Sequence, residues 1–250
     1  MDGLPQDAVG FLILFARVGA VLMLLPVFSD ESVPVRIRLL MALGMTVGLW
    51  GLLRGQVLPF ASNDASLPGI LIAELLVGLG LGMIVRIMFL AIAIAGSIIS
   101  LQVGLTSAVV ADPAQGGSAP LLSKFISVAA AVVCMGLAVH HLWIVSIVRS
   151  YAIFPVGGLP PAADFAELAL NTTTRAMGLA VSLSAPLIVY GIVFNVALGL
   201  AARLAPAIQI FFVAQPLNLL LGMALFISTI GLILTGFAQA MAGWLQAGWG

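Results

Sequence analysis

Six apolar segments follow one another along this chain, and they restrict it to one class of fold. They span residues 8–28, 37–53, 68–101, 121–148, 176–200 and 217–249. An α-helix needs about 20 apolar residues to cross a bilayer, so most of these segments are long enough. Only 7% of the 250 residues are charged, whereas soluble domains have about 25%. The sequence therefore predicts an all-α integral membrane-type protein with about six apolar helical segments.

The composition also limits the function. Nine basic and nine acidic side chains give a formal net charge of zero, so nothing indicates a nucleic-acid partner. The single cysteine, Cys134, provides neither a disulfide framework nor a metal site. His140 and His141 are neighbours and would point about 100° apart on a helix, so they cannot chelate one ion. The sequence has no Walker motif, paired CxxC or nucleophile elbow. We therefore expect no enzymatic activity, no metal and no cofactor.

The charged residues inside apolar segments include Arg17, Glu74 and Arg86. An arginine at mid-span costs about 2.5–3.5 kcal/mol, so Arg17 should face protein, water or a carboxylate. Glu74 and Arg86 would lie about 18 Å apart on one continuous helix and cannot pair with each other. Each is expected to find a partner elsewhere, in this chain or in another. Buried ion pairs that hold helices together are favoured over a proton relay, because a relay strings several such groups together.

The third segment, 68–101, is too long for one straight span. It contains Gly78, Gly80 and Gly82, which predict a bent helix or two helical pieces hinged near those glycines. Residues 149–175 are expected to form a polar connection before the fifth segment, and residues 167–171 within it could already be helical.

Further basic residues lie at the ends of apolar segments. Arg36 and Arg38 are two positions apart and would point about 200° apart on a helix, so they cannot form one patch. We expect one to face lipid headgroups and the other a partner subunit. Six residues are thus candidates for charge contacts between helices or subunits: Arg17, Arg36, Arg38, Glu74, Arg86 and Arg203.

The loop between the third and fourth segments, residues 102–120, has an unusual composition. It contains several turn-forming residues, and Asp112 is its only ionisable side chain. A weakly charged loop between membrane-grade helices must lie in protein or line a cavity, because lipid cannot satisfy its backbone. We interpret it as a loop that closes a pore, and an ordinary interhelical turn is the alternative. The candidate gating residues are Gly104, Val109, Val110, Asp112, Pro113, Gly116 and Gly117.

Within this loop, Val109 and Val110 are the candidates for an apolar seal, since a dewetted apolar constriction stops ions. Gly116 and Gly117 are the candidates for a hinge, because glycine gives the backbone conformational freedom.

Short motifs follow one another over nearly the whole chain. They are Arg17-Val-Gly19, Pro26-Val-Phe28, Pro34-Val-Arg36-Ile-Arg38, Glu74-Leu-Leu-Val-Gly78, Gln102-Val-Gly104-Leu, Asp112-Pro113, His140-His141-Leu, Pro155-Val-Gly157, Ala185-Pro186, Asn195-Val-Ala-Leu-Gly199, Arg203 and Pro206. In their order these motifs resemble those of the FliR family of flagellar type III export-gate proteins, whose counterpart in virulence injectisomes is SctT.

The resemblance implies a fold of kinked helical hairpins in a hetero-oligomeric export gate. Residues 1–175 would be a FliP-like helical region with a plug loop at 104–120, and residues 176–250 a FliQ-like helical hairpin. The family often has aromatic residues in that loop, whereas this chain has Val109 and Val110 there and no aromatic residue.

The resemblance also implies partners and a location. One FliR-like chain would form, with FliP and FliQ, a closed conical channel for unfolded flagellar proteins, with FlhB and FlhA nearby. Membrane lipid would surround it in the bacterial inner membrane, at the flagellar basal body. The flagellar branch is favoured over the injectisome by the motifs His140-His141-Leu and Pro155-Val-Gly157.

Two other function classes are alternatives. A secondary ion or solute transporter would use the intramembrane residues Arg17, Glu74 and Arg86, but such transporters usually contain internal repeats, and no convincing repeat is found here. An intramembrane hydrolase would need a nucleophile and a base on facing helices, and the sequence does not indicate such a pair.

Overall fold

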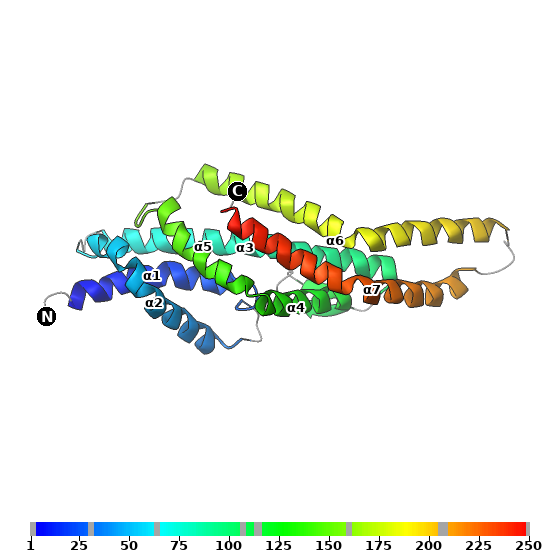
Figure 1. Cartoon of the computed structure of the whole chain (residues 1–250), viewed down its shortest axis with the longest axis horizontal. Coiled ribbons are helices and arrows are strands. Elements are labelled where there is room, and N and C mark those ends of the chain that lie inside the picture. The colour runs from blue at the N-terminus through cyan, green and yellow to red at the C-terminus, as the bar shows by residue number, and fades with distance from the viewer. Residues whose placement is uncertain are drawn as a thin grey trace. The chain divides into compact units, whose positions relative to one another are not determined.

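The computed structural model describes residues 4–29, 33–62, 66–105, 109–112, 117–158, 162–204 and 210–248. Helices account for nearly all of them (Figure 1). The helices are α1 (Leu4–Leu24), α2 (Val35–Val57), the short 3-10 turn η1 (Leu58–Phe60), α3 (Leu67–Val103), α4 (Leu121–Gly136), α5 (Val139–Ile153), α6 (Ala162–Leu204) and α7 (Ile210–Gln246). Two strands, β1 (Val109–Asp112) and β2 (Gly117–Pro120), lie between α3 and α4. The predicted all-α membrane-type fold is confirmed, with a short hairpin added.

Five helices of the described chain are long and apolar enough to cross a membrane, judged by length and composition alone. Their spans are Gln6–Leu24, Val35–Phe60, Leu67–Val103, Ala162–Leu204 and Ala214–Gln246. Helices α4 and α5 pass the same test only as a pair bent by 77°, which brings the number of spans to six if the pair is one span. These spans agree with the six apolar segments of the sequence.

The fourth apolar segment is two helices rather than one. Helix α4 ends at Gly136, and α5 begins at Val139. Between them, Ala138 has a left-handed backbone with φ 58°, a conformation that a right-handed helix cannot continue. Alanine carries no signal for this break, so the apolar pattern alone does not reveal it.

The polar connection predicted over 149–175 is helical at both ends, because α5 runs to Ile153 and α6 includes residues 167–171, which were expected to be a possible helix. Helix α6 begins at Ala162 and runs for 43 residues, through Pro186, to Leu204. Its first turns are polar, with Asp164 at the N-terminus, where the helix dipole favours an acidic side chain. Helix formation here does not require an apolar face, so hydropathy underestimates the length of α6.

The chain divides into two compact units, each assembled from separate segments. The first comprises Met1–Met88, His140–Thr173 and Trp244–Gly250, and the second comprises Phe89–Val139 and Thr174–Gly243. Helices α3, α6 and α7 each contribute to both units. The boundary predicted between residues 175 and 176 falls inside α6.

In the first unit, α1 and α2 lie side by side (Figure 1). Phe11 of α1 and Trp50 of α2 have ring centroids 6.0 Å apart. The tip of the Trp50 ring sits where Gly10 has no side chain, 3.1 Å from the position of an added Cβ. A small residue therefore allows a large ring to pack against the helix backbone.

The glycines of α3 allow close packing rather than a hinge. A Cβ added to Gly78 would lie 2.6 Å from the backbone oxygen of Arg17, and one added to Gly82 would lie 2.8 Å from Cβ of Leu24. A Cβ added to Gly80 would overlap the ring of Phe165 in α6. Helix α3 is uninterrupted from Leu67 to Val103, so the prediction of two helical pieces is wrong. The glycines let α1 and the start of α6 approach its backbone closely.

Candidate functional site

The segment predicted to close a pore contains an antiparallel hairpin in the second unit. Strands β1 and β2 pair in the register Val109↔Pro120, Val110↔Ala119, Ala111↔Ser118 and Asp112↔Gly117. Pro113 and Gly116 lie outside the described residues, as do the side chains of Val109, Val110 and Asp112. A β-branched pair between turn-forming residues is a hairpin signal, and the sequence analysis treated it only as a flexible loop.

The hairpin leaves α3 through a glycine cap. Gly104 has φ +85°, and the amide of Leu105 donates to the carbonyl of Ser100, at 2.9 Å. This is the bond pattern of a helix that ends in a left-handed residue, a conformation that glycine adopts without steric cost. At the other end, β2 leads into α4, with Pro120 at the N-cap. Gly104 thus sets the direction in which the hairpin departs.

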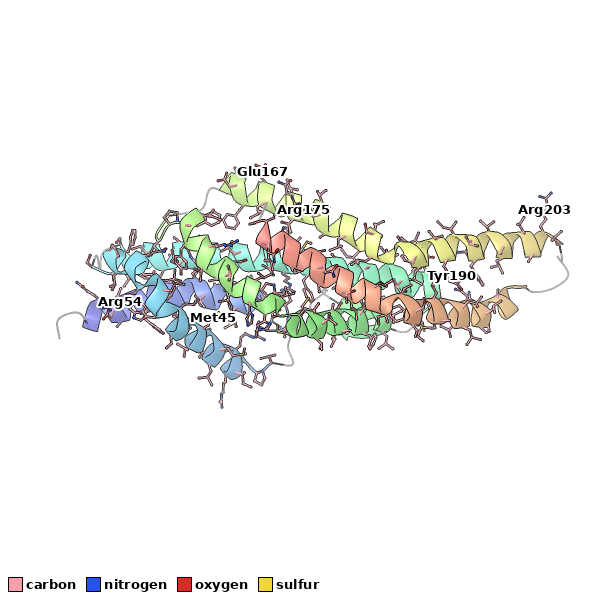
Figure 2. All side chains as sticks on the ribbon, viewed as in Figure 1. Met45, Arg54, Glu167, Arg175, Tyr190 and Arg203 are labelled. Carbon is pink, nitrogen blue, oxygen red and sulfur yellow. The ribbon has the colours of Figure 1, made fainter. Side chains whose placement is uncertain are left out.

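Two polar side chains that were not predicted from the sequence are linked by hydrogen bonds to this exit point, one directly and one through the other. Asn218 of α7 donates from Nδ2 to the carbonyl oxygen of Gln102, at 3.2 Å. The hydroxyl of Tyr190 in α6 lies 2.8 Å from Oδ1 of Asn218 and 3.1 Å from its backbone oxygen. Figure 2 labels Tyr190 on α6. The available signal was the presence of polar side chains within apolar segments, where such groups usually have a role.

An apolar groove of about 580 Å³ lies beside the hairpin in the second unit. It is lined by Leu105, Leu121, Leu122, Phe125, Met223, Phe226, Ile227 and Ile230. Leu105 and Leu121 directly flank the hairpin in the sequence. The groove therefore lies next to the ends of α3 and α4, to which the hairpin is joined.

A second cluster lies in the first unit, where Arg17 and Glu74 are both fully buried. Arg17 donates from Nε to Oε2 of Glu74 at 2.7 Å, and from a terminal nitrogen to Oε1 at 2.8 Å. This bidentate geometry is the strongest form of the arginine–carboxylate pair. It joins α1 to α3, and the remaining contacts of the two groups reach α5 and the turn that follows it.

Those contacts satisfy the remaining polar atoms of Arg17 and Glu74. Arg17 also donates to the Ser150 hydroxyl at 3.4 Å and to the Phe154 carbonyl at 3.0 Å. Its guanidinium carbon lies 3.9 Å from the centroid of the Tyr151 ring, a cation–π contact. The amide of Gly157 donates to Oε1 of Glu74 at 3.2 Å. Buried charges are tolerated when they are paired and hydrogen-bonded in this way, so the cluster acts as a structural lock.

The structure does not bring Arg86 to this pair. Glu74 and Arg86 lie on the continuous helix α3, and twelve residues of helix span about 18 Å. The three-residue pathway considered for a transporter is therefore not assembled by α3.

The remaining candidate charges lie near the surface. Arg36 and Arg203 are exposed, and Arg203 projects from the end of α6 (Figure 2). Arg38 is half-buried and donates to the carbonyl of Val33 at 3.3 Å. The exposed Arg54 (Figure 2) forms an ion pair with Asp7 at 2.8 Å, which sequence reasoning did not predict. Among the described residues, no group of three or more His, Cys, Asp and Glu side chains is arranged to hold a metal ion.

Comparison with known proteins identifies the family. Residues 8–244 match the family described as Bacterial export proteins, family 1. Over 227 residues the chain is 41% identical to Flagellar biosynthetic protein FliR of Caulobacter vibrioides. The aligned region covers 91% of this chain and 89% of the relative. The chain belongs to the FliR family of bacterial export proteins. The resemblance seen in the sequence motifs is thereby confirmed.

Other FliR relatives are more distant but match over similar lengths. The Escherichia coli FliR is 33% identical over 87% of this chain and 82% of its own length. The Bacillus subtilis FliR is 30% identical over 89% of this chain and 86% of its own length. Membership in an export-protein family favours the export interpretation over the ion or solute transporter.

Proposed function

We propose that this chain is a subunit of the flagellar type III protein export gate. In this proposal it forms, with FliP and FliQ, the closed channel through which unfolded flagellar proteins leave the cell. The observation that carries the proposal is the match to the export family over residues 8–244, together with relatives named as flagellar biosynthetic proteins. The chain would act by shape and gating, without a catalytic step or a cofactor.

The hairpin between α3 and α4 is the proposed plug. Its two strands carry a single ionisable residue, Asp112, so it adds little charge to a lumen. An apolar constriction excludes water and thereby stops ions, and a hairpin joined to helices at both ends is able to move aside as a unit. These properties suit a gate that is tight at rest and admits an unfolded chain.

Partners are proposed because much of the apolar surface is uncovered. Half of the α1 and α3 spans is buried within the chain, but only 11% of the α2 span is. Exposed apolar patches of this extent mark contacts with lipid or with other proteins. On α2, Gly44, Gly48, Gly51 and Gly55 have nothing within 4 Å of an added Cβ. Such a glycine face allows another helix to approach closely, and FliP is its proposed partner.

The proposed location follows from the same surfaces. Helices of membrane length support a membrane location, and the proposed site is the bacterial inner membrane at the flagellar basal body. FlhB and FlhA are expected to lie nearby.

Copurification tests this proposal directly. A tagged copy of the chain, expressed in cells that contain the flagellar genes, is expected to be recovered in a large complex with two other small hydrophobic proteins. The isolated chain is expected to be poorly stable, because its exposed apolar faces lack their partners. A thermally stable, monodisperse monomer in detergent, with no gain on adding the partners, would count against the proposal.

A further inference from the structure

We infer that Tyr190 and Asn218 position the root of the hairpin, so that α6 and α7 set its resting position. The root is the last turn of α3 with Gly104 and Leu105. The root bracket is the hydrogen-bonded set of Tyr190, Asn218 and Gln102. All of these residues belong to the second compact unit. The inference rests on the proposed function, because a resting position has consequences only if the hairpin closes a channel.

The first step is the contact between α7 and α3. Gln102 lies in the last turn of α3, which ends at Val103. Carbonyl groups in the last turn of a helix have no amide partner within that helix. Asn218 Nδ2 supplies one to the Gln102 carbonyl, at 3.2 Å. Asn218 thus caps the end of α3 from another helix.

The second step is the contact that orients Asn218. The Tyr190 hydroxyl donates to Oδ1 of Asn218, at 2.8 Å. With Oδ1 held as the acceptor, the amide nitrogen is directed to the Gln102 carbonyl. One hydroxyl on α6 thereby fixes the side chain on α7 that holds the end of α3.

Glycines bring these three helices together at the same place. A Cβ added to Gly191, the residue after Tyr190, would overlap the side chain of Gln102. A Cβ added to Gly222, one turn after Asn218, would lie 3.1 Å from Cα of Val103. Helices α6 and α7 therefore both approach the end of α3 at the level of the bracket.

Other polar side chains of α6 and α7 show a different behaviour. Ser182, Asn195 and Thr235 donate to carbonyls of their own helices, at 2.8–2.9 Å. Such local bonds satisfy a polar group in apolar surroundings without joining helices. Tyr190 and Asn218 instead reach across to neighbouring helices. Their hydrogen bonds therefore restrict the position of one helix relative to another.

Packing holds the last turn of α3 against α6 and α7, but it is incomplete beside Leu105. The apolar groove lined by Leu105 and Leu121 leaves about 580 Å³ beside the root, and space of this kind permits movement that close packing would resist. Directional hydrogen bonds fix a position where packing is incomplete. A shift of α6 against α7 that separates Tyr190 from Asn218 would therefore release the end of α3 and let the hairpin move.

Amide hydrogen exchange on the purified export complex tests the bracket. Tyr190→Phe removes the hydroxyl and keeps the ring, whose centroid lies 5.8 Å from that of the Phe194 ring. Loss of a hydrogen bond of this kind should speed exchange in peptides covering residues 101–121 by roughly two- to tenfold. Ser182→Ala is the matched control, since it removes an α6 hydroxyl that bonds only within its helix, and it should leave this exchange unchanged.

A second variant keeps the test decisive. Asn218→Leu has a side chain of similar size and lacks both amide atoms, so it should accelerate exchange at residues 101–121 at least as much as Tyr190→Phe. Complex recovery is measured in parallel for every variant. Exchange at the parent rate in both assembled variants would overturn the inference.

Leakage of small solutes into resting cells separates this inference from the proposed function. We expect Tyr190→Phe to raise the leak, and Ser182→Ala to match the parent. Faster exchange without any leak would support the bracket and count against the hairpin as the plug. If a shortened hairpin leaks but Tyr190→Phe alters neither exchange nor leak, the bracket is wrong and the proposed function stands.

Discussion

At the scale of single residues, Arg17 illustrates how a charge is kept inside an apolar protein. Its guanidinium contacts four groups suited to a cation: a carboxylate, a hydroxyl, a carbonyl and a ring face. Removal of one member of such a buried pair leaves the other uncompensated, which typically costs about 3–5 kcal/mol. An exposed pair is worth about 0–1 kcal/mol. The described residues provide an example of each kind, the buried pair Arg17–Glu74 and the exposed pair Arg54–Asp7.

This contrast gives a matched pair of variants. Arg17→Met should strongly reduce the amount of assembled complex and lower its melting temperature in detergent, whereas Arg54→Met should change both only slightly. The same side chain is removed in both cases, so burial is the main difference. If the Arg17→Met complex assembles normally but no longer exports, a role of the pair in transport is supported and the structural lock is refuted.

The sequence predicted part of this cluster. An arginine inside an apolar segment was expected to face protein, water or a carboxylate, and Glu74 was already a candidate for a charge contact between helices or subunits. The pairing itself joins positions 57 apart, which no local periodicity encodes. The carbonyl of Phe154 and the amide of Gly157 are backbone groups, and their availability depends on where α5 ends rather than on residue type.

At the scale of elements, glycines on different helices occupy different surroundings. Gly78 faces the backbone of α1, whereas Gly178, on α6, has nothing within 4 Å of an added Cβ. In an open position, replacing glycine by alanine favours the helix by roughly 0.8–1.0 kcal/mol. In a closed position the added methyl group forces the helices apart, typically at about 1–3 kcal/mol.

Gly78→Ala should therefore lower the melting temperature of the complex, and Gly178→Ala, the same substitution at an open site, should leave it unchanged or raise it. Differential scanning fluorimetry in detergent measures both. Equal shifts in the two variants would show that Gly78 is not a close-packing position.

Sequence periodicity predicted the existence of the elements better than their limits. The apolar segments correctly predicted where helices occur, because a run of apolar residues long enough to cross a bilayer is a strong signal. The break at Ala138 was missed since it depends on one left-handed backbone. The start of α6 at Ala162 was missed since its first turns are polar. The hairpin was treated as coil because a glycine-rich loop and a two-stranded ribbon have similar compositions.

At the scale of the whole molecule, no contiguous stretch of sequence corresponds to a compact unit. Each unit draws on segments far apart in the chain, and three helices contribute to both. The family was predictable, because its motifs recur in order along the sequence, and the comparison confirmed it. The bracket formed by Tyr190 and Asn218 was not, because it depends on where the ends of three helices meet.

The central claim is that the hairpin between α3 and α4 closes a channel, and ion conductance in resting cells tests it most directly. Shortening the chain between Ala108 and Gly117 should leave the complex assembled, because the flanking helices keep their packing. The assembled, shortened form should leak ions and small solutes, whereas Ser182→Ala, the control, should stay as tight as the parent. A shortened complex that assembles fully and conducts no more than the parent would contradict the claim and place the seal elsewhere.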